Sequence, residues 1–556
     1  MTGGLSWRGI VVAIYVLAVV FIGLGDRGLN EPDEGRYAAI AREMAENGDW
    51  LVPHLNGIPH FQKPPIIYWS TALAFQCFGV NEASARLPST LAALGMLALT
   101  FTIGRRLYGV ETATGAVFVL VAAIEFFGLA RMLTPDMMMS FWIAAAVFCL
   151  VKHRLDGGRK WGWLFFAAMG LGFLTKGPMA FVVPVSAAVA WRVAAGPAPE
   201  GRRLPWLTGM ALALAIGLSW FVVLAIREPQ LGSYFAGYEL MQRFTSKVHG
   251  RSKPVWFFVP VLLAGLLPWT PALITMAGQL VRRWRGGWRP TPDAWLLVGW
   301  VVPPLIVLSL SGSKLLTYVL PLFPPLAIAL AQWQCQSPAI ARRGHGVAAG
   351  IFLLAAVGML LAHRWVPQPD LGGFAVPLLF VALGLGAAAG LRKLAANPVA
   401  ALGCISLAAS VGWLWTVNQA DRVNDLLGAQ SSIRPLARQV LRAADFDRAT
   451  FFVVDARLHG WEFYLRRPVS VTLADSDVVL PLTPEQQERL LPDAKQSAEI
   501  AKILERRAPA YGLIRARSYA KEFSTNHWVV LGQASHYYLI ATRDAALARP
   551  MLAEKP

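Results

Sequence analysis

The chain has 556 residues, of which 55% are hydrophobic and only 15% are charged. The mean hydropathy is +0.47, and the charged fraction is well below the roughly 25% of soluble domains. Composition therefore excludes an ordinary soluble protein and indicates a polytopic α-helical membrane protein. The net charge of +18 does not indicate nucleic-acid binding, because the basic residues stand in short clusters between apolar runs. Such clusters set membrane topology and contact anionic lipids.

Apolar runs of about 20 residues are long enough to cross a bilayer. The first run, Val11–Leu24, has no small-residue cleavage site after it, so we expect a retained span and not a removed signal peptide. The sequence predicts about 13 transmembrane helices, at residues 8–25, 83–104, 111–130, 137–152, 161–175, 178–195, 205–226, 255–281, 293–311, 315–333, 346–363, 373–391 and 399–417.

Basic residues alternate between the two sides of these predicted spans. The loops after the even-numbered spans are rich in arginine and lysine, as in Arg105-Arg106 and Arg342-Arg343, whereas the short loops on the other side carry few cations. By the positive-inside rule, the N-terminus is expected in the cytoplasm and the C-terminus outside. We find no inverted internal repeat of the kind that marks many transporters.

Three segments on the outer side are long or polar: 26–82, 227–254 and the tail from Asn418. Within the first, the short apolar run Ile66–Val80 is expected to be interfacial or re-entrant. In the tail, short β-type runs alternate with helical stretches, which predicts a small α/β domain. We therefore expect a transmembrane catalytic domain at 1–417 and a periplasmic soluble domain at 418–556.

Acidic residues at two predicted helix starts are the first candidates for catalysis. Asp33 and Glu34 follow Glu31-Pro32, and Asp136 follows Thr134-Pro135. Each acid is also explained by ordinary helix capping. If Asp33 and Asp136 instead converge on one outer cavity, the helix dipoles keep them ionised, and they can accept a proton or bind a cation.

Cations in the outer segments are candidates for binding a phosphate. Lys63 precedes two prolines that fix its backbone, and Lys314 and Tyr318 lie at an outer helix end. The loop 234–254 adds Arg243, Lys247, His249, Arg251 and Lys253. Together these residues predict a site for the phosphate of an amphiphilic ligand. The alternative for Lys63 is snorkelling to the interface, and for Arg251 and Lys253 it is surface anchoring. His249 is a candidate metal ligand, with simple hydrogen bonding as its alternative. Cys77, Cys149, Cys335 and Cys404 have no metal-ligand spacing.

These motifs, taken together and in this order, resemble the GT-C glycosyltransferases. More closely, the chain resembles the lipid A aminoarabinose transferases, relatives of the protein O-mannosyltransferases in the glycosyltransferase 39/83 group. The matching pieces are Pro-Asp-Glu-x-Arg-Tyr-Ala at 32–38, Lys-Pro-Pro-x-x-Tyr-Trp at 63–69, Thr-Pro-Asp at 134–136, Thr-Lys-Gly-Pro at 175–178, Arg243-Phe with His249 and Arg251, and Ser-Lys-Leu-x-Thr-Tyr-x-Leu-Pro at 313–321.

The resemblance implies that Asp33 and Asp136 lie at the reaction centre, with Glu34 as a further candidate. It places Lys63, Arg243 and Tyr318 around the lipid phosphate, and Arg36 beside Asp33. Tyr37, Arg251 and Lys314 complete the candidate substrate-binding set. One departure is that relatives often carry Glu where this chain has Gln62.

We therefore expect an inner-membrane enzyme that moves a sugar, foremost 4-amino-4-deoxy-L-arabinose, from undecaprenyl phosphate to a phosphate of lipid A on the periplasmic side. A monomer with no required cofactor is expected, and a divalent metal at His249 stays open. A protein or another glycolipid as acceptor is the first alternative. A lipid or sugar transporter without chemistry is the second, although it predicts polar residues at mid-membrane depth, whereas here they cluster at outer helix ends.

Overall fold

The computed structural model describes residues 7–197, 202–235, 253–365, 371–418, 432–454, 456–471, 479–491, 497–507, 509–516, 519, 523, 527–534, 536–545 and 547. The chain forms two compact units. The membrane unit comprises Met1–Leu24 and Pro88–Gln419, and the α/β unit comprises Gly25–Leu87 and Ala420–Pro556. The sequence prediction assigned the segment 26–82 to the membrane domain, whereas the structure groups it with the C-terminal residues.

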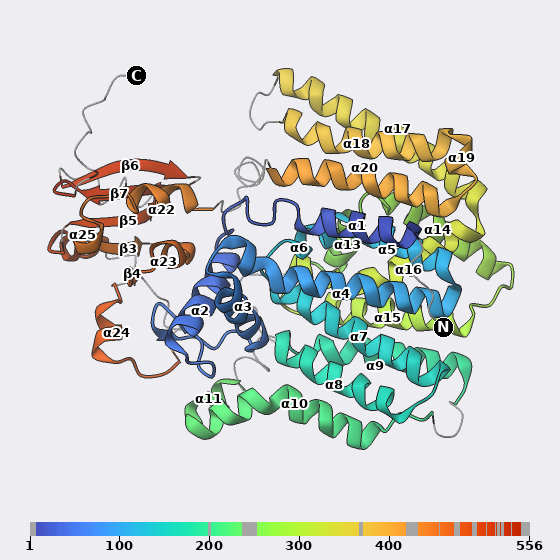
Figure 1. Ribbon diagram of the computed structural model, residues 1–556, viewed down its shortest axis with the longest axis horizontal. Helices are drawn as coiled ribbons and strands as arrows, with labels where there is room; N and C mark the ends of the chain where they lie inside the picture. The colour runs from blue at the N-terminus through green and yellow to red at the C-terminus, as the bar shows by residue number, and fades with distance from the viewer. Residues whose placement is uncertain are drawn as a thin grey trace. The chain divides into compact units, whose positions relative to one another are not determined.

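The membrane unit is built almost entirely from helices (Figure 1). Its elements are α1 (Trp7–Phe21), α4 (Glu82–Tyr108, whose first residues belong to the α/β unit), α5 (Val110–Ala122), α6 (Ile124–Ala130), α7 (Pro135–Leu155), α8 (Arg159–Lys176), α9 (Met179–Ala195), α10 (Trp206–Arg227), α11 (Pro229–Ser233), η2 (Val255–Phe257), α13 (Phe258–Gly265), α14 (Thr270–Arg285), α15 (Pro292–Leu310), η3 (Leu316–Leu322), α16 (Phe323–Gln336), α17 (Pro338–Trp365), α18 (Leu371–Gly390), α19 (Arg392–Ala395) and α20 (Pro398–Asn418).

Each of the thirteen predicted spans falls on one of these helices or on a helix pair. By length and composition, seven helices in the described part of the chain can cross a bilayer singly, or nine when two bent pairs are counted as spans. The spans predicted at 111–130 and 255–281 each correspond to a bent helix pair. Helices α5 and α6 meet at a bend of 72°, and the break between α13 and α14 is 118°. At this second break Pro268 follows Leu267. The Leu267 carbonyl accepts a hydrogen bond from the backbone N–H of Ile124 in α6.

Small residues let neighbouring helices approach closely. A Cβ on Gly299 of α15 would lie 2.8 Å from the Ser186 carbonyl of α9, and one on Gly170 of α8 would lie 2.7 Å from the Ala213 carbonyl of α10. Close backbone approach supplies the van der Waals contact that holds helices together where lipid removes most of the hydrophobic driving force. The same packing brings α17, α18 and α20 side by side (Figure 1).

Arg131 explains an exception to the charge alternation of the sequence. It follows α6 and is buried, and its guanidinium donates to the carbonyls of Val19 (2.9 Å), Val20 (3.0 Å) and Ile22 at the end of α1. The last carbonyls of a helix lack partners within the helix and carry partial negative charge. Arg131 therefore caps α1 and does not report topology.

The α/β unit contains a five-stranded sheet in the order β4-β3-β5-β7-β6. Its strands are β3 (Thr450–Val454), β4 (Val469–Val471), β5 (Ala510–Arg515), β6 (Trp528–Ala534) and β7 (Tyr537–Thr542). Strand β3 pairs in parallel with β4 and β5, and the other pairings are antiparallel. The helices of the C-terminal part are α22 (Arg434–Val440), η4 (Phe446–Arg448), α23 (Gly460–Leu465), α24 (Pro484–Glu488) and α25 (Ser497–Glu505).

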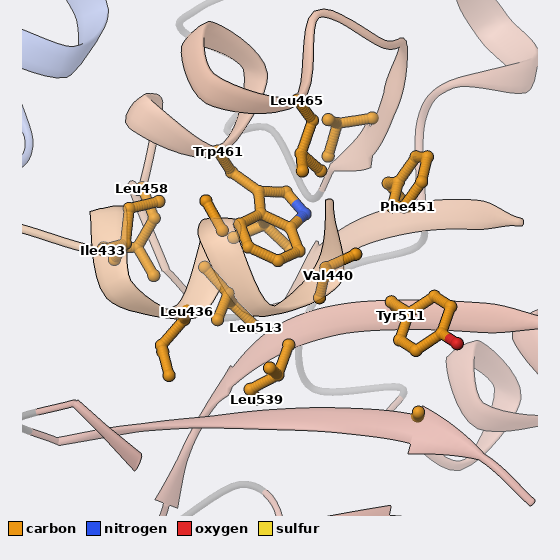
Figure 2. Close-up of a cluster of buried hydrophobic side chains, with 14 of the residues drawn as sticks. Ile433, Leu436, Val440, Phe451, Leu458, Trp461, Leu465, Tyr511, Leu513 and Leu539 are labelled. Atoms are coloured by element: carbon orange, nitrogen blue, oxygen red, sulfur yellow. The ribbon is translucent and has the colours of Figure 1, made fainter. Parts of the chain in front are cut away.

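The central strands bury both faces. Along β3, Phe451 and Val453 belong to one hydrophobic cluster, and Phe452 and Val454 belong to another. This alternation follows from the period of two residues in a strand. Figure 2 shows the first cluster, in which Trp461 of α23 packs with residues of α22 and β5. The predicted α/β domain is thus present. The β-type runs of the sequence at Phe451–Val454, Val469–Leu473, Gly512–Ile514 and Tyr537–Ala541 fall on β3, β4, β5 and β7.

The segment 25–87 adds α2 (Asp33–Asn47), α3 (Ile66–Phe78) and a two-residue hairpin formed by β1 (His54–Leu55) and β2 (Ile58–Pro59). The hairpin turn is Asn56-Gly57, with φ of 56° and 73°. Asn-Gly is the preferred pair where both turn residues need positive φ. The short helix α3 matches the predicted interfacial segment in extent.

Candidate functional site

Asp33 begins α2 and is the exposed acid of the candidate set in the α/β unit. Its side chain is 57% exposed, and Oδ1 accepts a hydrogen bond of 2.6 Å from Arg36 Nη2. The predicted pairing of Arg36 with Asp33 is therefore confirmed. Pro32 occupies the cap position and no side-chain cap bond is formed, so the alternative interpretation of Asp33 as an N-cap was wrong.

Arg36 connects Asp33 to Gln62, which lies just before α3. Its Nη1 donates to Gln62 Oε1 at 3.3 Å, and its guanidinium lies 5.2 Å from the centre of the Tyr37 ring. Tyr37 is buried and packs against Tyr68 with ring centres 6.1 Å apart. Gln62 thus accepts a hydrogen bond from Arg36 without adding charge, and Asp33 is the carboxylate that pairs with this guanidinium among the described residues.

Glu34 lies next to Asp33 but in a different environment. It is fully buried, and its oxygens accept from Arg27 Nη1 (2.8 Å), Arg86 Nε (2.9 Å), Arg86 Nη2 (3.1 Å) and the Asn30 amide (3.0 Å). Burial alone raises a carboxyl pKa, but Arg27 and Arg86 outweigh it and hold the pKa of Glu34 well below its usual range. A carboxylate so engaged favours a structural role over contact with a reacting group.

Arg86 was not singled out by sequence reasoning. It is fully buried, and beyond Glu34 it donates to the Arg27 carbonyl (3.0 Å) and the Gly28 carbonyl (2.8 Å). The available signal was an arginine inside an apolar run, which is costly unless it is paired. Its bonds fix the loop that enters α2 and thereby the position of Asp33.

Lys63 and Lys314 each bond to a nearby carbonyl. Lys63 Nζ donates to the Gln62 carbonyl at 3.2 Å, and it precedes α3 as the prolines at 64 and 65 predicted. Lys314 is buried in the membrane unit, where its ammonium donates to the Ser311 carbonyl. Backbone carbonyls therefore compensate the cost of burying Lys314.

Asp136 is the centre of a second cluster, in the membrane unit. It is buried in the first turn of α7, and its Oδ1 accepts from Lys176 Nζ at the end of α8. Lys176 Nζ also lies 4.9 Å from the centre of the Tyr318 ring in η3. Because α7 and α8 are consecutive and antiparallel, the start of one and the end of the other lie at the same end of the bundle. Three helical elements thus bring an acid, a cation and a phenol together.

Lys176 is the residue of this cluster that sequence reasoning left without a role. It appeared only within the Thr-Lys-Gly-Pro motif at 175–178, and that motif was the available signal. Tyr318, which was predicted beside a phosphate, stacks on Phe258 of α13 with ring centres 6.4 Å apart.

Several predictions are not tested by these contacts. Asp33 and Asp136 belong to different units, so their convergence on one cavity stays a prediction. Arg243, His249 and Arg251 lie outside the described residues. Within the described ranges, no group of three or more His, Cys, Asp or Glu side chains is placed to hold a metal ion, and the metal option at His249 also stays a prediction.

Comparison with known proteins identifies the family. Residues 6–235 match the dolichyl-phosphate-mannose-protein mannosyltransferase family model. An undecaprenyl phosphate-α-4-amino-4-deoxy-L-arabinose arabinosyl transferase of Pectobacterium carotovorum is 31% identical over 445 residues, which cover 76% of this chain and 78% of the relative. The enzyme of the same name from Serratia proteamaculans is 34% identical over 59% of each chain. The chain thus matches 59% and 64% of the lengths of the first two such relatives, the second from Sodalis glossinidius.

Among solved structures, the crystal structure of ArnT from Cupriavidus metallidurans bound to undecaprenyl phosphate matches 98% of this chain and 100% of that chain, with a TM-score of 0.81 and 25% identity. The same protein in the apo state matches with a TM-score of 0.79. The expected GT-C fold is therefore confirmed, in a multi-pass membrane protein. The chain belongs to the undecaprenyl phosphate-α-4-amino-4-deoxy-L-arabinose arabinosyl transferase family.

Proposed function

We propose that this protein transfers 4-amino-4-deoxy-L-arabinose from undecaprenyl phosphate to a phosphate of lipid A. The observation that carries the proposal is the Asp136–Lys176 ion pair beside Tyr318, at one end of a bundle of this family. Burying an ion pair costs desolvation free energy that its own attraction often does not repay, so such a pair is a candidate for a functional role. Its cation is of the kind that binds a phosphate. The reaction takes place on the periplasmic side of the inner membrane, with the protein acting as a monomer.

The reaction breaks the bond between the sugar's anomeric carbon and the lipid phosphate oxygen, and an acceptor oxygen forms the new bond. The departing undecaprenyl phosphate gains negative charge, which nearby cations stabilise. Lys63 and Lys176 are the described cations that we assign to this task, and Arg243 is added from the family motif. Undecaprenyl phosphate leaves with the bonding electrons and needs no proton when cations compensate its charge.

The acceptor decides what the two aspartates do. A phosphate acceptor is already an anion and needs orientation more than deprotonation. In that case Asp33 and Asp136 act as positioning residues that hold Arg36 and Lys176. An acceptor hydroxyl would instead need one aspartate as general base. Because both aspartates are paired with cations, the geometry favours the phosphate acceptor. These steps require no resident cofactor in our proposal, and a divalent metal remains the alternative to be tested.

Glu34 holds the start of α2, and therefore Asp33, in position. Its bonds to Arg27 and Arg86 fix the chain at the start of α2, where Asp33 is exposed. We therefore assign Glu34 as a positioning residue, not a group that contacts substrate.

The test uses purified protein in liposomes with undecaprenyl phosphate-aminoarabinose and lipid A. Mass spectrometry should detect lipid A that carries the added sugar, and Asp33→Asn and Asp136→Asn proteins should lose at least about a hundredfold in rate. Full turnover by either variant would remove that aspartate from the mechanism. Transfer to a protein or another glycolipid, with lipid A unchanged, would overturn the assigned acceptor. A chelator arm tests whether a metal is needed.

A further inference from the structure

A pocket in the α/β unit adjoins the Asp33–Arg36 pair, and Arg36 and Gln62 are among its lining residues. Between its walls lie about 720 Å³ of empty space, open solvent included. One wall is the β1–β2 hairpin with Gln62, and the other is formed by the ends of β3 and β4 and the turn into α23. All of its lining residues belong to the same compact unit.

The pocket lies at the carboxyl ends of two neighbouring parallel strands. Strands β3 and β4 pair in parallel, and α23 connects them. Val453 and Val471, at or next to the last residues of β3 and β4, both line the pocket.

Hydrogen bonds hold the hairpin wall in place. The Asn56 side chain donates to the Val469 carbonyl (2.5 Å) and accepts from the Val469 amide (3.0 Å). Arg489 donates to the Asn56 carbonyl and Gln486 to the Gly57 carbonyl, both at 2.7 Å. The two walls of the pocket are therefore already hydrogen-bonded to each other. Ligand binding then needs little further ordering of the protein, and this lowers the entropic cost of binding.

The lining combines cations with amides and an apolar surface. Arg36, Arg457 and His459 bring positive or ionisable nitrogen to the pocket, and Glu462 is the one acid among its described lining residues. Glu462 Oε1 lies 3.8 Å from His459 Nδ1, and Oε2 has no hydrogen-bond partner in the described part of the chain.

The state of Glu462 decides the charge of the pocket. Its carboxyl is buried, and this burial raises its pKa to about 8, against the opposing effect of Arg42 and Arg489. At neutral pH Glu462 is then largely protonated and offers an O–H donor. The described lining thus presents donors and net positive charge.

The geometry points to this pocket as a binding site for a phosphorylated sugar, which on the proposed function is the headgroup of the acceptor lipid. Arg36 and Arg457 bind the phosphate, the amides of Asn56 and Gln62 and the Glu462 carboxyl bind sugar hydroxyls, and Leu55 and Leu458 pack on the sugar ring. Arg36, bonded to Asp33, connects the pocket to the candidate reaction centre.

Binding to full-length protein in detergent tests the pocket, with three probes: glucosamine 1-phosphate, glucosamine and inorganic phosphate. Glucosamine 1-phosphate should bind at least about tenfold more tightly than either fragment, since both walls then contribute. Arg457→Gln, a change of an exposed side chain, should weaken that binding by about tenfold. The matched control Arg438→Gln, exposed on α22 of the same unit, should leave binding unchanged.

The outcomes separate the pocket from the proposed function. Equal binding by wild type and Arg457→Gln would overturn the pocket, whatever the transfer activity. Equally tight binding of inorganic phosphate and the phosphosugar would also overturn the pocket proposal, because the pocket would then recognise the phosphate alone and not the sugar. Phosphosugar binding that Arg457→Gln weakens, in a protein that transfers no sugar, would support the pocket and overturn the function. With transfer active, Arg457→Gln should raise KM for the acceptor and leave KM for the donor unchanged.

Discussion

Replacing Arg86 by Met should strongly destabilise the α/β unit. The change removes four hydrogen bonds of 2.8 to 3.1 Å from a fully buried guanidinium, two of them to Glu34. Glu34 then keeps Arg27 and the Asn30 amide but has lost one of its two cationic partners. Breaking one partner of a buried pair costs about 3–5 kcal/mol, which corresponds to a fall of roughly 10 °C in Tm for a unit of this size.

Thermal unfolding of the full-length protein in detergent, followed by tryptophan fluorescence, measures this loss. Arg105→Met is the matched control, because Arg105 is exposed on the same helix α4, and it should cost less than about 0.5 kcal/mol. The double variant Glu34→Gln/Arg86→Met should recover part of the stability, since no buried carboxylate is then short of a cation. The recovery stays partial because Arg27 also loses Glu34 as its ion-pair partner. A Tm for Arg86→Met that equals the control would refute the assigned role of the Glu34 cluster.

The pH dependence gives a second check on this cluster. The pKa of Glu34 is lowered in the folded protein, so its contribution is present above the unfolded pKa near 4.3 and is lost only as pH falls far below that value. Wild type should therefore keep this contribution between pH 5 and pH 8. In Arg86→Met the carboxyl takes up a proton more easily, and its deficit should be smaller at pH 5 than at pH 8. A deficit that grows towards pH 5 contradicts the assignment.

Three further predictions follow from single contacts. Lys176→Met should lower the transfer rate about a hundredfold or more by removing the cation between Asp136 and Tyr318, and Lys176→Arg should restore part of it in the same kinetic assay. Burial raises the pKa of Glu31 to about 8, so the stability it contributes below pH 4 to 5 is lost as pH rises towards 8; Glu31→Gln should flatten the fall of Tm between pH 5 and pH 9, and an unchanged slope would refute this. Gly460→Ala would place a Cβ 2.2 Å from Glu31 Oε1, and a cost of about 1–3 kcal/mol should appear as faster proteolysis of the α/β unit.

Hydropathy predicted the membrane helices because a bilayer imposes one length and one polarity on every span. It could not predict the bend at Ala123, since a break inside a continuous apolar run depends on packing against neighbours. At the second bend Pro268 was an available signal, because proline interrupts a helix. The Asn56-Gly57 hairpin was missed although its turn residues are a known signal. The strands that flank it are only two residues long, which is too short for an alternation of apolar and polar residues to indicate them.

The candidate site shows the same division between local and distant information. The Asp33–Arg36 pair spans three residues on one helix, so the sequence could predict it. The Asp136–Lys176 pair joins residues from two helices, and only the fold reveals it. Likewise, nothing local distinguishes Asp33 from Glu34, yet one is exposed and the other is buried against Arg86.

The most direct test of the central claim is the mass of lipid A from a bacterial host that lacks its own aminoarabinose transferase. Expression of this chain should add the mass of one or more aminoarabinose groups to lipid A, and expression of the Asp33→Asn form should not. Lipid A of unchanged mass, from cells in which the intact chain is present in the inner membrane and the donor lipid accumulates, would contradict the account.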